Sequence, residues 1–97
     1  MEKDAIAVLR EHRGYLAKKF GVSEIAIFGS YARGEQRDDS DVDIMVEFRK
    51  GFKTFDNYMD LKFYLEELLG RRVDLIIKSA IRFRIKPFII EEAVFLK

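Results

Sequence analysis

The stretch that decides the fold runs from Phe28 to Val46 and reads FGSYARGEQRDDSDVDIMV. It starts at the end of a short apolar run, passes a Gly-Ser pair and a polar loop, and enters an alternating segment. In residues 41–48 hydrophobic side chains alternate with polar ones, and Asp41 and Asp43 share the polar side. This period of two is typical of a strand that buries one of its faces.

Helices and strands are expected to alternate on both sides of this stretch. Apolar residues at helical spacing before Gly21 predict a first helix, and β-forming residues predict the strand that follows. The expected elements are a helix over 3–20, a strand over 24–29, a helical turn from Ser30 to Gly34, a strand over 41–48, a helix over 55–69, a strand over 72–78 and a short helix from Pro87 to about Ala93. Residues 94–96 are expected to form a final strand or a docking segment.

This order of elements predicts an α/β (α+β) fold. We expect a small mixed sheet with helices packed mainly on one face, while the other face carries the polar residues of the middle strand. The 97 residues fit one domain, residues 1–97. A core of this size leaves no deep internal cavity, so any active site should be an open cleft.

Composition and charge argue against several classes of function. The net charge of +1 gives no strong signal for nucleic-acid binding. No run of 18 apolar residues and no signal peptide are found, so neither a membrane segment nor export is expected, and a cytoplasmic location follows. The absence of cysteine excludes disulfides, thiolate metal sites and a cysteine nucleophile.

The aspartates of the middle strand are the main candidates for chemistry. Asp41 and Asp43 project from the same face, with Cβ atoms about 6–7 Å apart. Two such carboxylates repel each other unless a proton or a cation lies between them, and Mg²⁺ prefers carboxylate and phosphate oxygens. Asp74 lies within the third strand, where an unpaired aspartate is costly to bury. If that strand neighbours the middle one, Asp74 joins the pair.

Three carboxylates on one sheet face can hold two metal ions that stabilise an in-line phosphoryl displacement. Asp74 could also accept the proton of the attacking hydroxyl. The alternative is an acidic, solvated loop that runs into an edge strand, and the spacing of the aspartates alone does not exclude it.

The Gly-Ser pair supplies a second element of a site. Gly29 allows the backbone to approach a phosphate closely, and the hydroxyl of Ser30 adds a donor beside free backbone N–H groups. Taken alone, Ser30 could be an ordinary helix cap. Arg33 is a further candidate for phosphate binding, although it could equally pair on the surface with Asp38 or Asp39.

These residues resemble a known family. Gly29-Ser30, ten residues and then Asp41-Val42-Asp43 look like the GS-x10-DxD motif of the DNA polymerase beta nucleotidyltransferase superfamily, and the full stretch resembles its minimal nucleotidyltransferase (MNT) branch. The segments LEELLGRRVDLI and IEEAVFL resemble the family's third-carboxylate strand and its C-terminal end. The resemblance therefore covers nearly the whole chain.

The resemblance implies a polymerase-beta-like palm fold and the transfer of a nucleotidyl group from ATP with Mg²⁺. Asp41 and Asp43 would be the motif carboxylates, Asp74 the third metal ligand, and Gly29 and Ser30 the groups that hold the triphosphate. It further implies a HEPN-domain partner in a type VII toxin–antitoxin system, in which the MNT antitoxin adenylylates a tyrosine of the HEPN ribonuclease toxin.

Two other functions are compatible with the sequence. The chain could neutralise its partner by docking alone, or it could transfer a nucleotide to a small molecule or an RNA end. Because it lacks the extra domains of larger transferases, the acceptor surface should come from a partner protein or a second copy, which makes a homo- or hetero-oligomer possible.

Overall fold

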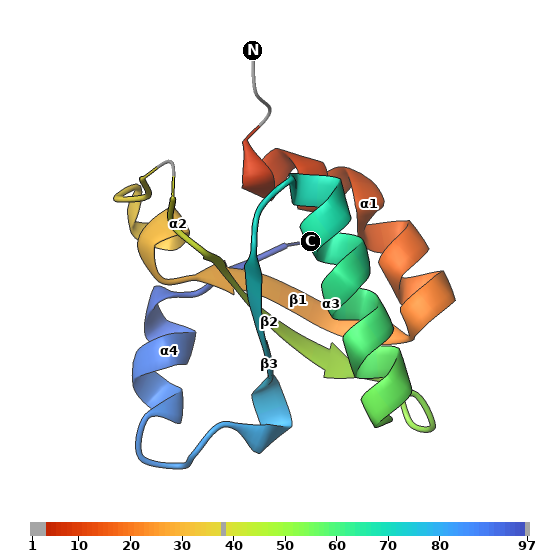
Figure 1. Ribbon diagram of the computed structural model, residues 1–97. Helices are drawn as coiled ribbons and strands as arrows, with labels where there is room; N and C mark the ends of the chain where they lie inside the picture. Colours follow the sequence, from red (N-terminus) through yellow and green to blue (C-terminus); the bar gives the residue numbers. More distant parts are fainter. Residues whose placement is uncertain (1–3, 38, 97) are drawn as a thin grey trace.

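A computed structural model describes residues 4–37 and 39–96, so Asp38 of the predicted loop lies outside the described residues. Helices and strands alternate along most of the chain (Figure 1). The elements are α1 (Ala5–Phe20), β1 (Val22–Phe28), α2 (Ser30–Arg33), β2 (Val42–Phe48), α3 (Phe55–Leu69), β3 (Val73–Ile77), the 3-10 turn η1 (Lys78–Ala80), α4 (Lys86–Glu92) and β4 (Val94–Phe95).

The four strands form one mixed sheet in the order β3-β2-β1-β4. β1 runs antiparallel to both β2 and β4, whereas β2 and β3 are parallel. A parallel pair needs a crossover connection, and α3 supplies it. The predicted mixed α/β fold is confirmed, and residues 94–95 are a strand that pairs with β1.

Local signals set the ends of the two long helices. The Asp4 side chain accepts a hydrogen bond from the Ile6 N–H at the start of α1, and the Thr54 side chain accepts one from the Asn57 N–H at the start of α3. α1 is followed by Gly21, as predicted, and α3 spans the predicted residues 55–69. α3 therefore agrees with the prediction at both ends, whereas α1 ends at the predicted residue but begins at Ala5, two residues later than predicted.

The core lies between one face of the sheet and the helices α1 and α3 (Figure 1). Alternate residues of the strands point into it, so this face is almost entirely apolar. The residues with no measurable exposure are Leu9, Leu16, Ala26, Ile27, Val42, Ile44, Leu61 and Leu65, and all but Ala26 belong to this core. The expected packing of helices mainly on one face is confirmed.

The other face of the sheet differs from the expectation in its middle part. Met45 and Ala26, which pair across β2 and β1, are 1% and 0% exposed, so the centre of this face is buried and apolar rather than polar. α4 lies on this side of the sheet, opposite α1 and α3 (Figure 1). The polar residues of β2 are thereby separated into two groups, one at each end of the strand.

β1 begins two residues earlier than predicted because tertiary contacts extend it. Val22 pairs with Phe48, and the Arg49 N–H donates a hydrogen bond to the Gly21 carbonyl at 2.7 Å. The polar Ser23 and Glu24 gave no apolar pattern to indicate this extension. Among the described residues, no helix has the length and apolar character needed to cross a membrane.

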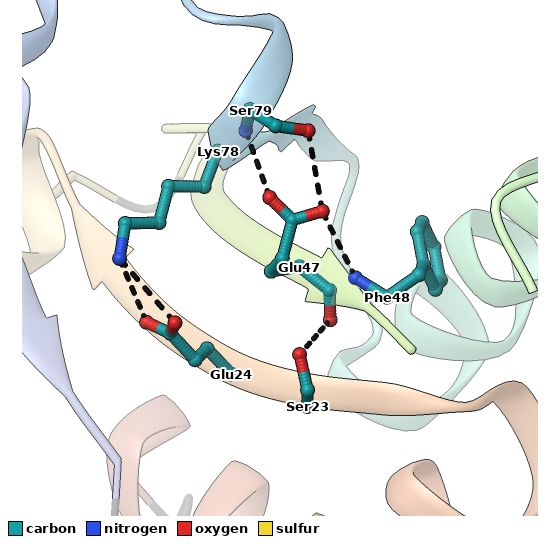
Figure 2. A network of polar contacts seen from close by, with 6 residues as sticks. All are labelled: Ser23, Glu24, Glu47, Phe48, Lys78 and Ser79. Atoms are coloured by element: carbon teal, nitrogen blue, oxygen red, sulfur yellow. Dashed lines mark hydrogen bonds and ion pairs between the residues drawn. The ribbon is translucent and has the colours of Figure 1, made fainter. Parts of the chain in front are cut away.

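A network of hydrogen bonds and ion pairs links β1, β2 and η1 at the end of the sheet where β2 and β3 finish (Figure 2). The Glu47 carboxylate accepts hydrogen bonds from the N–H of Ser79 at 2.9 Å and from the hydroxyl of Ser79 at 3.2 Å. It also accepts one from the N–H of Phe48 at 3.2 Å. Beside it, Lys78 pairs with Glu24 at 3.0 Å. The carboxylates at this end are thus matched by donors from η1 and from the strand itself.

Candidate active site

The opposite end of the same face brings two aspartates together. Asp43 on β2 is the direct register partner of Asp74 on β3, so the two side chains leave neighbouring parallel strands side by side. Asp43 is half-buried and Asp74 is exposed. The sequence placed Asp74 beside Asp43 on the condition that the third strand neighbours the middle one. β3 does pair with β2, so this condition is met.

The surroundings of Asp43 disfavour its negative charge. Burial raises the pKa of Asp43 above its usual value, and the nearby carboxylates of Asp74 and Asp41 raise it further, while Arg33 opposes them. Desolvation and like charges both favour the neutral form of a carboxyl group. A cation beside Asp43 would reverse this preference, which makes the position suitable for a metal ion with oxygen ligands.

Asp41 lies on the same side of the chain but has another partner. It directly precedes β2, and its Oδ1 pairs with the Nε of Arg72 at 3.3 Å. The side chains are 49% and 81% exposed, and an ion pair this exposed contributes little to stability. The contact therefore holds Asp41 only weakly and can be exchanged for another cation at small cost.

The three aspartates do not form a closed ligand set as they stand. Within residues 4–37 and 39–96, no three acidic, histidine or cysteine side chains are gathered closely enough to hold a metal ion. Asp43 and Asp74 are neighbours, and Asp41 is turned to Arg72. The donor set nevertheless fits a hard divalent cation, because it consists of carboxylates and because the charges of Asp74 and Asp41 disfavour the ionised form of Asp43 unless a cation is near.

Gly29 places the Gly-Ser turn directly against Asp43. Phe28, the last residue of β1, pairs with Asp43, and Gly29 follows with φ 70° and ψ −147°, a conformation almost confined to glycine. A Cβ atom on Gly29 would also overlap the Oδ2 of Asp43. Both backbone conformation and space therefore require glycine here, and the turn lies in contact with Asp43.

Ser30 and Arg33 are the first and last residues of α2, which Gly29 precedes. Arg33 does not pair with Asp39 in the structure. Its Nε donates to Glu35 at 2.6 Å and its Nη1 to Glu92 at 3.1 Å. Arg33 therefore forms ion pairs on the surface, which was one of the two predictions. Among the described residues its partners are Glu35 and Glu92 instead of the predicted Asp39.

Glu92 is the part of this site that the sequence did not indicate. It is the last residue of α4, and its Oε1 accepts a hydrogen bond from the Gly29 N–H at 3.0 Å. The IEEAVFL segment that contains it looked like the C-terminal end of a family, and nothing in its pattern pointed to the Gly-Ser turn. Only the topology, which carries the chain back beside β1, brings Glu92 to this position.

An open hollow adjoins Asp74. It has a volume of about 540 Å³ and is lined mostly by apolar side chains, with Asp74 as its acidic member. Its walls include Phe28, Tyr58, Ile76, Ile85 and Ile89. A second hollow of about 730 Å³ lies between the start of α1 and the end of α3 and contains none of the three aspartates, so we place the chemistry at the first.

The surface beside this hollow exposes large apolar side chains. Phe83 and Phe88 are 88% and 71% exposed, and Ile85 is 49% exposed. Side chains of this size and exposure, gathered on one segment, are typical of a surface that meets another molecule.

Comparison with known proteins agrees with this geometry. The family model described as nucleotidyltransferase domain matches residues 9–96. The protein adenylyltransferase MntA of Thermococcus cleftensis is 43% identical over 90 residues, which cover 93% of this chain and 90% of that protein.

Solved structures give the same result. A protein provisionally named as a minimal nucleotidyltransferase superposes with a TM-score of 0.82 and 36% identity over 97% of this chain and 95% of its own. A chain from the complex of the tri-AMPylated HEPN toxin of Shewanella oneidensis with its MNT antitoxin has a TM-score of 0.68 over 95% of this chain and 71% of its own. Its identity is 18%, so it supports the fold alone.

The match over residues 9–96 and the likeness to MntA over nearly the full length lead to one conclusion: this chain belongs to the nucleotidyltransferase domain family and is a nucleotidyltransferase.

Proposed function

We propose that this nucleotidyltransferase is an antitoxin that transfers AMP from ATP, with Mg²⁺, to a tyrosine of a partner HEPN ribonuclease toxin. One observation carries the proposal: the Gly29 turn lies against Asp43, and Asp43 lies in register with Asp74. A place for phosphate and a pair of carboxylates for metal thus meet at one point of the sheet. MntA of T. cleftensis bears the name of a protein adenylyltransferase, which supports a protein as the acceptor.

Each candidate residue then has a chemical role. Gly29 would let the backbone approach the triphosphate closely, Ser30 would offer its hydroxyl, and Arg33 would offer the donors not taken by Glu35 and Glu92. Asp41, Asp43 and Asp74 would hold the divalent cations. When bound, two Mg²⁺ ions would neutralise charge on the attacking and leaving oxygens. Release of Asp41 from its exposed pair with Arg72 would complete the set of ligands.

The reaction proposed is an in-line displacement at the α-phosphorus. The phenolic oxygen of the acceptor forms a bond to that phosphorus, and the bond to the oxygen that bridges to the β-phosphate breaks, so pyrophosphate leaves. Asp74, on the wall of the apolar hollow, is placed to take the proton of the phenol. A tyrosine suits this hollow because it has an apolar ring and a polar tip.

The acceptor is expected to arrive on a partner protein. Ile85 lines the hollow, and the exposed Phe83 and Phe88 lie near it in the sequence. Aromatic side chains are enriched in protein interfaces. Docking there would bring an acceptor side chain toward Asp74. A second copy of this chain could meet the same surface, and size-exclusion chromatography with light scattering would separate the two assemblies.

The test is transfer of label from ATP to the partner. The chain, Mg²⁺, α-³²P-ATP and the HEPN protein proposed as its partner are expected to give a labelled HEPN band that is lost when the acceptor tyrosine is replaced by phenylalanine. Asp43→Asn should abolish labelling but keep binding to the partner, while Asp60→Asn, on the exposed side of α3, should label normally.

The same pair of variants separates enzyme from docking module. If Asp43→Asn neutralises the HEPN ribonuclease as fully as the unaltered chain does, neutralisation occurs by contact and the proposed transfer is not its cause. Labelling of a small molecule or an RNA end in place of the HEPN protein would replace the acceptor proposed here.

A further inference from the structure

The carboxylate of Glu92 joins the C-terminal helix to the Gly-Ser turn. One oxygen accepts the Gly29 N–H at 3.0 Å, and the other accepts Nη1 of Arg33 at 3.1 Å. These two partners lie at either end of α2, the short helix that carries Ser30. A single side chain thus fixes both ends of the segment proposed to bind the triphosphate.

The charge of Glu92 carries an electrostatic cost at this position. Its carboxylate lies close enough to Asp43 to add to the negative charge around that residue. A neutral amide would accept the Gly29 N–H without this repulsion. The charge of Glu92 is therefore unfavourable toward Asp43 and favourable toward Arg33 and the Gly29 N–H, because both hydrogen bonds are charge-assisted.

Arg33 is held from two sides. Glu35 accepts its Nε at 2.6 Å and Glu92 accepts its Nη1 at 3.1 Å. A guanidinium group carries five N–H donors in a rigid fork, so two carboxylates that engage Nε and Nη1 leave donors for a further anion. Arg33 lowers the pKa of Asp43, so its positive charge favours the ionised form of that carboxyl group.

We propose that Glu92 is a positioning residue for nucleotide binding: it holds the Gly29 turn in place and aims Arg33 at the triphosphate. This inference rests on the proposed function, because it assigns the triphosphate to the Gly29 turn. It makes the end of α4, just before β4, part of the nucleotide site. Glu92 acts through Gly29 and Arg33 and has no contact with the reacting atoms.

The experiment compares variants of Glu92 in their affinity for ATP with Mg²⁺, measured by isothermal titration calorimetry without an acceptor. Glu92→Ala loses both contacts and is expected to bind about tenfold more weakly. Glu92→Gln keeps an acceptor for the Gly29 N–H but loses the charge on Arg33, and is expected to bind about threefold more weakly. Glu91→Gln, the exposed neighbour on α4, is the matched control and should bind normally.

A thermodynamic cycle with Arg33→Met tests the route of the effect. If Glu92 acts through Arg33, Glu92→Gln should weaken ATP binding little further once Arg33 is absent, because coupled residues are not additive. In transfer assays the KM for ATP should rise more than kcat falls. Urea unfolding of each variant shows whether a loss of affinity is a loss of folded protein.

Three results would overturn the inference. If folded Glu92→Ala binds ATP with unchanged affinity, the contacts of Glu92 with Gly29 and Arg33 serve only the structure. Tighter ATP binding by Glu92→Gln would mean that the carboxylate competes with phosphate. Additive effects in the cycle would exclude action through Arg33. If the unaltered chain itself binds no ATP with Mg²⁺, the proposed function fails and this inference with it, whereas normal binding with unaffected variants contradicts this inference alone.

Discussion

The two ends of β2 carry acidic side chains on the same face of the sheet and use them in opposite ways. At one end Glu47 accepts hydrogen bonds from Ser79 and Phe48, and Lys78 neutralises Glu24 (Figure 2). At the other end Asp43 has Asp74 as its register partner, and its pKa is raised by burial and by neighbouring carboxylates. Only the buried Met45 separates Glu47 from Asp43 on this face.

The difference shows what each end contributes. The Glu47 end uses charge to join elements of the fold, so removing its charge should cost stability. The Asp43 end holds like charges close together, so removing one of them should cost activity while stability stays the same or improves. Enzymes often hold such unfavourable arrangements at their sites.

Asp74→Asn should have the largest effect on the transfer rate. An Asp74→Asn variant that keeps its activity would contradict the contrast between the two ends of β2. We expect transfer to fall by about 10²–10³-fold, because a metal ligand and the proposed base are lost together. Folded stability should not fall, since a like charge beside Asp43 is removed. The measurements are initial rates of AMP transfer and urea denaturation. Asp43→Asn combined with Asp74→Asn should lose little more than either change alone, because both residues act as one unit.

Gly29→Ala should damage both activity and stability. Its new Cβ would overlap the Oδ2 of Asp43, and its backbone conformation suits only glycine, so we expect a loss of more than about 2 kcal/mol in unfolding free energy. Gly34→Ala is the matched control. Gly34 has a similar φ of 71°, but no atom lies within 4 Å of a Cβ placed there. It should lose about 1 kcal/mol and keep its transfer rate, and an inactive Gly34→Ala would remove the special role of Gly29.

Glu47→Ala should show the reverse profile. Loss of its hydrogen bonds to Ser79 and Phe48 is expected to lower the unfolding free energy by about 1–2 kcal/mol, as measured by urea denaturation. The transfer rate at a temperature where the variant stays folded should be unchanged. A rate that falls as far as that of Asp74→Asn would show that the two ends of the strand are not independent.

The smallest effect concerns pH, and its sign should differ between two acidic residues. The pKa of Asp43 is raised above 3.8, so the stability of the unaltered chain relative to Asp43→Asn is greatest below that pH and is lost as the pH rises through the raised pKa. The pKa of Glu66 is lowered below 4.5, chiefly by the Val73 N–H and then by Lys62. Relative to Glu66→Gln, the unaltered chain is therefore stabilised above that pH and loses the difference as the pH falls through the lowered pKa.

Denaturation of the three proteins from about pH 3 to pH 7, without divalent cations, measures both trends. Opposite slopes would sharpen the contrast between a carboxylate that repels its neighbours and one that is hydrogen-bonded. Parallel slopes would contradict it.

The sequence predicted the elements well because their signals are local. Helix caps, glycines after helices and alternating strands lie within a few residues of each other, and the helix over 55–69 agrees to the residue. The start of β1 at Val22 escaped prediction because pairing with Phe48, and not the polar residues beside it, makes it a strand. The burial of Met45 was not predicted either, because it depends on what covers this face of the sheet in the folded chain.

The sequence could indicate which residues lie near one another at the candidate site. It could not indicate the hydrogen bonds that link them to distant parts of the chain. The spacing of Gly29, Asp43 and Asp74 pointed to one chemistry, and the structure places Gly29 and Asp74 beside Asp43. The roles of all six residues in binding or catalysis, Gly29, Ser30, Arg33, Asp41, Asp43 and Asp74, remain predictions. The Glu92 contact with Gly29 spans 63 positions of the chain, and no spacing rule reaches that far.

The parallel pairing of β2 with β3 has a consequence for how the molecule folds. Asp43 and Asp74 become neighbours only when the crossover through α3 has closed, so their mutual repulsion belongs to the folded chain and is absent from the unfolded chain. A divalent ion that binds between them therefore has no comparable site in the unfolded chain, and by mass action it must raise the melting temperature. Such an ion would act as a folding ligand before any nucleotide arrives.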